Sequence, residues 1–121
     1  MIRAVPIATF LAGAVSSSCA GVDKTLNASD LSTCGADNPS AWSQLDQPPV
    51  EAENLRALAV ADYYKPTVDP MEWWLIRSDE ELILCKSERF PQKSTEGAWW
   101  KFERHNGNWT VVDQNGWIVV S

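Results

Sequence analysis

Apolar and polar positions alternate in short runs through the second half of the chain, from residue 71 to the end. Five runs show this period-two pattern: residues 71–77, 82–87, 98–104, 109–113 and 117–121. Short polar segments separate them, and the one at residues 78–81 is typical of a hairpin tip. Such a pattern indicates antiparallel strands joined in chain order, so we expect a meander sheet of about five strands.

Two Asn-Gly dipeptides, Asn106-Gly107 and Asn115-Gly116, separate the last three runs. Asn-Gly is the favoured dipeptide of the two-residue type I′ turn, so both should join neighbouring strands and fix their register. The expected cross-strand pairs are His105 with Asn108, Phe102 with Val111, Trp100 with Asp113, Gln114 with Trp117 and Val111 with Val120. Side-chain alternation would place Trp100, Phe102, Val111, Ile118 and Val120 on one face, and Trp99, Lys101, Val112, Gln114, Trp117 and Val119 on the other.

Before the strands, residues 50–65 carry small apolar side chains at helical spacing. Glu51 and Glu53 lie in the expected first turn, where the helix dipole favours acidic side chains, and Pro66 would end the helix. The apolar stripe is narrow and rich in alanine, so we expect this helix to lie on one face of the sheet. The predicted fold class is therefore α+β, with one helix packed on an antiparallel sheet.

Residues 19–49 are rich in Ser, Asn, Asp, Gly and Pro, and they predict a tether followed by an irregular arm. Within the arm, Asn38-Pro39 should open one or two helical turns that carry Trp42 and Leu45 inward. We expect three parts: a leader at residues 1–18 (or 1–20), the tether and arm at residues 19–49, and a single α+β domain at residues 50–121.

The leader is predicted from three zones: a cationic start with Arg3, an apolar stretch at residues 4–15 and a run of small polar residues. The apolar stretch is shorter than the roughly 20 residues that span a bilayer. No second long apolar run follows, so we expect an exported chain with no transmembrane helix in its mature part. The alternative is a buried helix of a cytosolic domain, but no amphipathic pattern continues after Val15.

Cys19 has two possible fates. The segment Val15-Ser16-Ser17-Ser18-Cys19 resembles the lipobox of small bacterial envelope lipoproteins, although Ser16 stands where that family usually has a branched aliphatic residue. The resemblance implies lipidation of Cys19 and, because Ala20 is not aspartate, an outer-membrane lipoprotein that faces the periplasm. Cleavage after Ala20 would instead remove Cys19 and leave a soluble periplasmic or secreted protein.

The chain has three cysteines, and either fate of Cys19 leaves the pair Cys34 and Cys85. An oxidising compartment favours a disulfide between them, and closing a loop of this length stabilises a domain by about 4 kcal/mol. Two buried free thiols are the alternative. A structural zinc site is not expected, because two cysteines and one histidine fall short of four ligands.

The chain is acidic, with 10 basic and 16 acidic residues. Loss of the leader with Arg3 leaves 9 basic residues against 16 acidic ones, a net charge of −7. This charge disfavours nucleic acid as a partner and favours a basic protein. Charge of this size also keeps small exported domains soluble, with no partner required.

Catalytic motifs are not apparent: the sequence has no G-x-S-x-G elbow, phosphate-binding glycine loop or H-E-x-x-H pair. The single histidine, His105, falls beside an expected turn, and the acidic cluster at residues 79–81 falls at a hairpin tip, where its pKa values would be ordinary. If the protein were an enzyme, Asp113, which is expected opposite Trp100, would be its most enclosed candidate carboxylate. We therefore expect a non-enzymatic protein with no cofactor and no metal.

Seven tryptophans are the compositional outlier, and six of them lie at or after Trp73. They can fill the core of a small domain, or some can form a binding patch, for which we select Trp99, Lys101, Glu103 and Trp117. The favoured hypothesis is a non-catalytic binding or inhibitory module, such as an immunity protein or an inhibitor of a basic wall-degrading enzyme. The alternative is a structural or accessory envelope lipoprotein.

Overall fold

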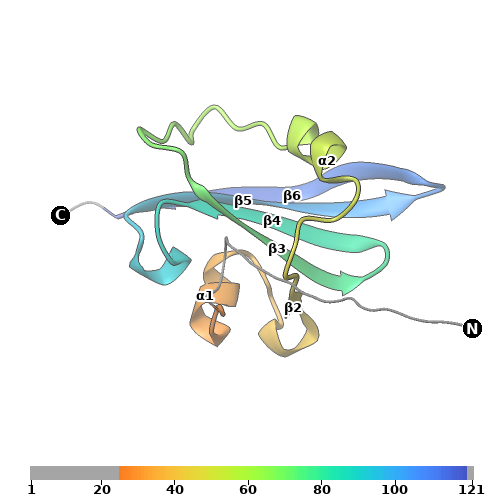
Figure 1. The fold of residues 1–121 in the computed structure, drawn as a ribbon, viewed down its shortest axis with the longest axis horizontal. Coiled ribbons are helices and arrows are strands. Elements are labelled where there is room, and N and C mark those ends of the chain that lie inside the picture. The colour runs from red at the N-terminus through yellow and green to blue at the C-terminus, as the bar shows by residue number, and fades with distance from the viewer. Residues whose placement is uncertain (1–24, 120–121) are drawn as a thin grey trace, which may run out of the picture.

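The computed structural model describes residues 25–119, which form a five-stranded antiparallel sheet with the strand order β2-β3-β4-β5-β6. The strands are β2 (Ser43–Gln44), β3 (Met71–Ser78), β4 (Glu81–Ser87), β5 (Glu96–His105) and β6 (Asn108–Ile118). The helices are α1 (Ala28–Thr33) and α2 (Ala52–Leu58), with 3-10 turns at Pro39–Ala41 and Pro91–Lys93. The α+β class with one disulfide is confirmed. Figure 1 shows α1 and α2 on opposite sides of the sheet.

Both faces of the sheet are covered, and each has its own hydrophobic core. We call the face under residues 25–44 the arm side and the face under α2 the helix side. The arm-side core contains Leu26, Cys34, Ala36, Trp42, Trp73, Leu75, Ile83 and Cys85. The helix-side core contains Ala52, Leu55, Trp74, Leu82, Leu84, Ala98, Trp100 and Phe102. Because side chains alternate along a strand, each adjacent pair of tryptophans supplies one ring to each core.

The predicted disulfide joins Cys34 to Cys85 with a Cα–Cα distance of 5.5 Å, and both residues are fully buried. It attaches the arm to β4, near the middle of the sheet. A hydrogen bond from the backbone N–H of Gln92 to Asp30 Oδ1 (3.2 Å) adds a second tie between the arm and the segment after β4. The residues expected to be an irregular arm thus form α1, the first 3-10 turn and β2, firmly attached to the sheet.

The turn at Asn106-Gly107 is confirmed: both residues have positive φ, of 55° and 82°, and His105 lies opposite Asn108. Phe102 also lies opposite Val111 as expected. A one-residue shift then follows between Lys101 and Phe102, so Lys101, not Trp100, is opposite Asp113, and the predicted pair of Trp100 with Asp113 is wrong. The extra residue on β6 is Val112, in the manner of a β-bulge.

The second turn, at Asn115-Gly116, does not form. Strand β6 continues through it, so that Gly116 lies opposite Ala98 and Gln114 lies opposite Trp100 on the helix side. A Cβ atom on Gly116 would come within 2.8 Å of the carbonyl oxygen of Gly97 and 3.3 Å of the Tyr63 ring. The glycine therefore allows close packing, and the fifth strand of the sheet is β2, not residues 117–121.

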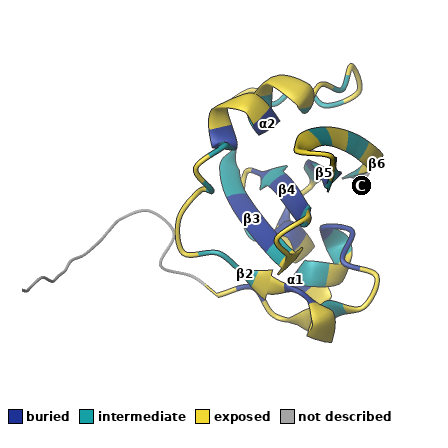
Figure 2. Cartoon of the chain, turned by 90° about the vertical axis from the view of Figure 1, so that its right-hand side faces the viewer, coloured by how far each residue is buried: buried dark blue, intermediate teal, exposed yellow. Residues whose placement is uncertain are grey.

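The long predicted helix is shorter than expected. It ends at Leu58, and the following residues run along the helix side of the sheet, where Ala59, Ala61 and Tyr64 pack against the core. Glu51 precedes the helix and Glu53 lies in its first turn. Figure 2 shows that the inner strands β3 and β4 are mostly buried and that the edge strand β6 is largely exposed.

Candidate functional site

The four residues of the predicted patch lie on the arm side of the sheet. Trp99, Lys101 and Glu103 are alternate residues of β5, and Trp117 of β6 is opposite Gly97 of β5. Both tryptophans are half-buried, and each ring lies against a glycine. A Cβ atom on Gly35 would come within 2.5 Å of the Trp99 ring, and one on Gly97 within 2.1 Å of the Trp117 ring. A large part of both rings is therefore used in packing.

Lys101 is enclosed rather than available to a ligand. Its Nζ lies 3.3 Å from Asp37 Oδ2 and about equally far from two indole rings, 5.8 Å from the Trp42 centroid and 5.9 Å from the Trp99 centroid. Only 8% of the residue is exposed. The ammonium group therefore connects the arm to β5, through a carboxylate and two aromatic faces.

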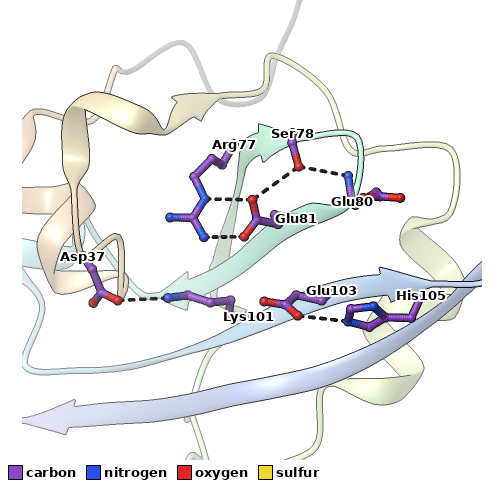
Figure 3. A network of polar contacts seen from close by, with 8 residues as sticks. All are labelled: Asp37, Arg77, Ser78, Glu80, Glu81, Lys101, Glu103 and His105. Atoms are coloured by element: carbon purple, nitrogen blue, oxygen red, sulfur yellow. Dashed lines mark hydrogen bonds and ion pairs between the residues drawn. The ribbon is translucent and has the colours of Figure 1, made fainter.

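A second cation lies on the same side, where β3 approaches its hairpin (Figure 3). Arg77 donates from Nε to Glu81 Oε1 at 2.9 Å and from Nη2 to Glu81 Oε2, and its guanidinium lies 4.7 Å from the Trp42 centroid. This hydrogen bonding lowers the pKa of the Glu81 carboxyl and raises the pKa of Arg77. The pair is rigid because the two-pronged contact fixes both side chains.

The end of the sheet with the two hairpin turns is acidic. We call Asp79, Glu80, Glu81 and Glu103 the acidic tip. Arg104 holds the tip backbone, because its N–H donates to the Glu80 carbonyl (2.9 Å) and its Nη2 donates to the Asp79 carbonyl (2.8 Å). Asp79 and Glu80 are exposed, and neither carboxylate makes an ion pair within residues 25–119. The acidic tip thus presents charge on a fixed backbone.

His105 contacts the acidic tip, with its Nε2 lying 3.0 Å from Glu103 Oε1, and its side chain is 68% exposed. Asp113 is exposed and lies opposite Lys101, outside any enclosed position. In the described part of the chain, no group of three or more His, Cys, Asp or Glu residues is arranged to hold a metal ion.

An open groove of about 260 Å³ lies at the other end of β5 and β6. Its lining consists of Tyr63, Glu96, Gly97, Asn115, Gly116, Trp117 and Ile118. Only Trp117 belongs to the predicted patch. The remaining residues come from three segments that are far apart in sequence, so no local sequence pattern predicts the groove. The Asn115-Gly116 dipeptide in its lining predicted a turn instead.

Cys19 and the leader lie outside the described residues. None of the helices between residues 25 and 119 is long and apolar enough to cross a membrane.

No protein-family model matches the chain, and comparison with curated proteins and with solved structures finds no match either. The function is therefore inferred from the surfaces of the molecule itself.

Proposed function

We propose that this protein is an exported, non-catalytic module that binds a basic protein through the acidic tip. The observation that carries the proposal is the pair of exposed carboxylates Asp79 and Glu80, which form no ion pair within residues 25–119, on a backbone held by Arg104. The partner class is an enzyme or toxin with a basic surface, such as a wall-degrading enzyme. The module would act as an inhibitor or immunity protein.

Electrostatics supports this choice of surface. Long-range attraction between an acidic and a basic surface raises the association rate, and the net charge of −7 that remains after loss of the leader adds to the local field. A fixed tip also lowers the conformational entropy lost on binding. Arg77 and Lys101 do not offset Asp79 and Glu80, because they are already engaged by Glu81 and Asp37.

Export is part of the proposal. A buried disulfide such as Cys34–Cys85 persists in an oxidising compartment, which is consistent with a periplasmic or secreted location. Attachment to a membrane would then depend on lipidation of Cys19. Intact mass of the protein from a bacterial host distinguishes an acylated Cys19 from a chain that begins near Gly21.

The binding proposal is tested by the association rate with a basic wall-degrading glycosidase of the lysozyme class, measured with inhibition of its activity. The double variant Asp79→Asn/Glu80→Gln should associate about tenfold more slowly at low salt, and high salt should abolish the difference. The control Glu53→Gln/Asp62→Asn removes the same charge from exposed sites elsewhere.

Equal association rates for the two double variants would contradict a role for the acidic tip. A panel of basic glycosidases with no binding at all would exclude this partner class.

The accessory role is favoured by one observation, the exposed edge strand β6 with Val112 and Ile118, which are 46% and 64% exposed. A larger assembly could cover this edge. Stable co-purification with a multi-protein envelope complex, abolished by Val112→Lys, would support that role.

A further inference from the structure

The groove at the start of β5 and the end of β6 has an aromatic wall. The Tyr63 ring lies over Gly116, since a Cβ atom there would be 3.3 Å from Tyr63 Cε2 and 3.6 Å from Tyr63 Cζ. Tyr63 nevertheless remains 44% exposed. One part of the ring is therefore packed on the backbone, and another part is open to a ligand.

Glu96 supplies negative charge to the same groove. It is opposite Ile118, two pairs along the ladder from the pair of Ala98 with Gly116, and alternation places its side chain on the helix side with Tyr63. Its carboxylate makes no ion pair or hydrogen bond with any residue between 25 and 119. A half-buried carboxylate without a cation is a preformed place for one.

The surroundings add to this negative potential. The Tyr64 hydroxyl is buried without a hydrogen-bond partner in the described chain, and burial raises its pKa to about 12, with further contributions from Glu96 and Glu88. Both glutamates therefore act on the Tyr64 hydroxyl, next in sequence to Tyr63. Lys86, on this side of the sheet, is paired with Glu72 and lies 6.0 Å from the Trp100 centroid.

We propose that this groove binds an organic cation, an ammonium or guanidinium group that pairs with Glu96 and stacks on Tyr63. A cation over an aromatic face and beside a carboxylate gains both ring attraction and a charge-assisted hydrogen bond. Ile118, which faces the same side of the sheet as Glu96, suits the apolar stem of such a ligand. An anion is disfavoured because Glu96 is the only charged residue of the lining. This site lies at the opposite end of the sheet from the acidic tip.

Methylguanidinium and its neutral isostere methylurea test the charge requirement. Amide NMR signals of Gly97 and Gly116 in the disulfide-bonded protein are followed during titration with each solute. Methylguanidinium should produce saturable shifts with a Kd of about 1 mM, and methylurea should not. Absence of saturation, or equal shifts with both solutes, would overturn the proposal.

Two variants test the assigned residues, since each removes one of the two contacts. Glu96→Gln should raise the Kd at least about tenfold, and Tyr63→Leu should raise it about threefold to tenfold. Glu53→Gln makes the same charge change at a side chain that is 95% exposed on α2, and it should leave the Kd unchanged. Wild-type affinity in Glu96→Gln, with its melting temperature retained, would sink the assignment.

The cation can come from a free amine-type metabolite or from an arginine or lysine of a partner protein. The blocked peptide acetyl-Gly-Arg-Gly-amide distinguishes them. Binding about tenfold tighter than methylguanidinium points to a side chain of a protein, because flanking backbone adds contacts along β6. Equal affinity points to a free cation.

Discussion

Glycines set the positions of three aromatic rings in this molecule. Gly35, Gly97 and Gly116 lie under Trp99, Trp117 and Tyr63, with hypothetical Cβ atoms at 2.5, 2.1 and 3.3 Å from the respective rings. Large side chains can thus lie flat on the backbone. Core packing accounts for a further four of the seven tryptophans, because the indoles of Trp42, Trp73, Trp74 and Trp100 are buried in the two cores.

Gly35→Ala should therefore destabilise the protein strongly. Gly35 has a φ of +87°, which costs alanine about 1 kcal/mol, and the new methyl group would also clash with the Trp99 ring. Gly107→Ala is the matched control, because Gly107 has a φ of +82° but no atom within 4 Å of the added Cβ. We expect losses of about 3 and 1 kcal/mol, respectively, in urea denaturation. Equal losses would mean that the Trp99 ring moves aside freely.

Trp99→Ala should cost about 2 to 3 kcal/mol, somewhat below the usual value for a fully buried tryptophan, because the ring is half-buried. The loss arises from the contact with Gly35 and from the missing aromatic face beside Lys101. Chemical denaturation gives this value, and association with the basic glycosidase gives the effect on binding. A stable variant with weakened binding would instead support the predicted patch.

The strands were the best predicted elements, because period-two alternation is a local signal. Residues 71–77, 82–87 and 98–104 each lie within an observed strand, and the turn at Asn106-Gly107 is where its dipeptide predicts. Asn115-Gly116 is the same dipeptide, but it lies within the extended strand β6. There the glycine leaves room for Tyr63, and Asn115 Oδ1 accepts the Gly116 N–H at 2.8 Å. A dipeptide cannot distinguish these roles, because the deciding neighbour is distant in sequence.

Helix α1 had a local signal that the composition of the arm obscured. Asn27 and Asp30 form a reciprocal capping box, in which each side chain accepts the other's backbone N–H. The same spacing in Ser/Thr-x-x-Glu is a known helix start. The groove had no such signal, because Tyr63, Glu96 and Gly116 meet only after the sheet is formed.

The segment after α2 depends on two tyrosines for its attachment to the sheet, and this makes stability fall at high pH. Burial raises the pKa of Tyr63 and Tyr64, the latter to about 12, so the folded protein retains protons that the unfolded chain loses near pH 10. The contribution is fully present below pH 10 and is lost as pH rises toward 12. Absorbance titration and denaturation at pH 8, 10 and 11.5 measure both effects. Tyr64→Phe should flatten most of this fall, and an unchanged slope in that variant would contradict the account.

The stability of the whole molecule depends on the Cys34–Cys85 disulfide, because this bond fastens the arm, with its core, to a sheet that carries a second core on its other face. Cys34→Ala/Cys85→Ala should lose about 4 kcal/mol in urea denaturation, and amides of α1 should exchange faster than those of β4. In wild type, both cysteines have 0% exposure, so a mild reductant should leave the native disulfide intact and cleave it only after unfolding. A double variant with an unchanged midpoint would mean that the arm-side core is sufficient without the link.

The same link determines how the molecule responds to mechanical tension. Cys34 and Cys85 are 51 positions apart in sequence but 5.5 Å apart at Cα, so a pull applied before Cys34 passes directly into β4. When the other end of the pull is applied after Cys85, the residues between the two cysteines, including α2 and β3, are shielded from the load. Reduction would release a hidden chain length on the order of 170 Å under force. The acidic tip lies inside this loop, so a pull between the N-terminus and the tip would instead run from Cys85 along β4 to residues 79–81, with α2 and β3 outside this shorter path.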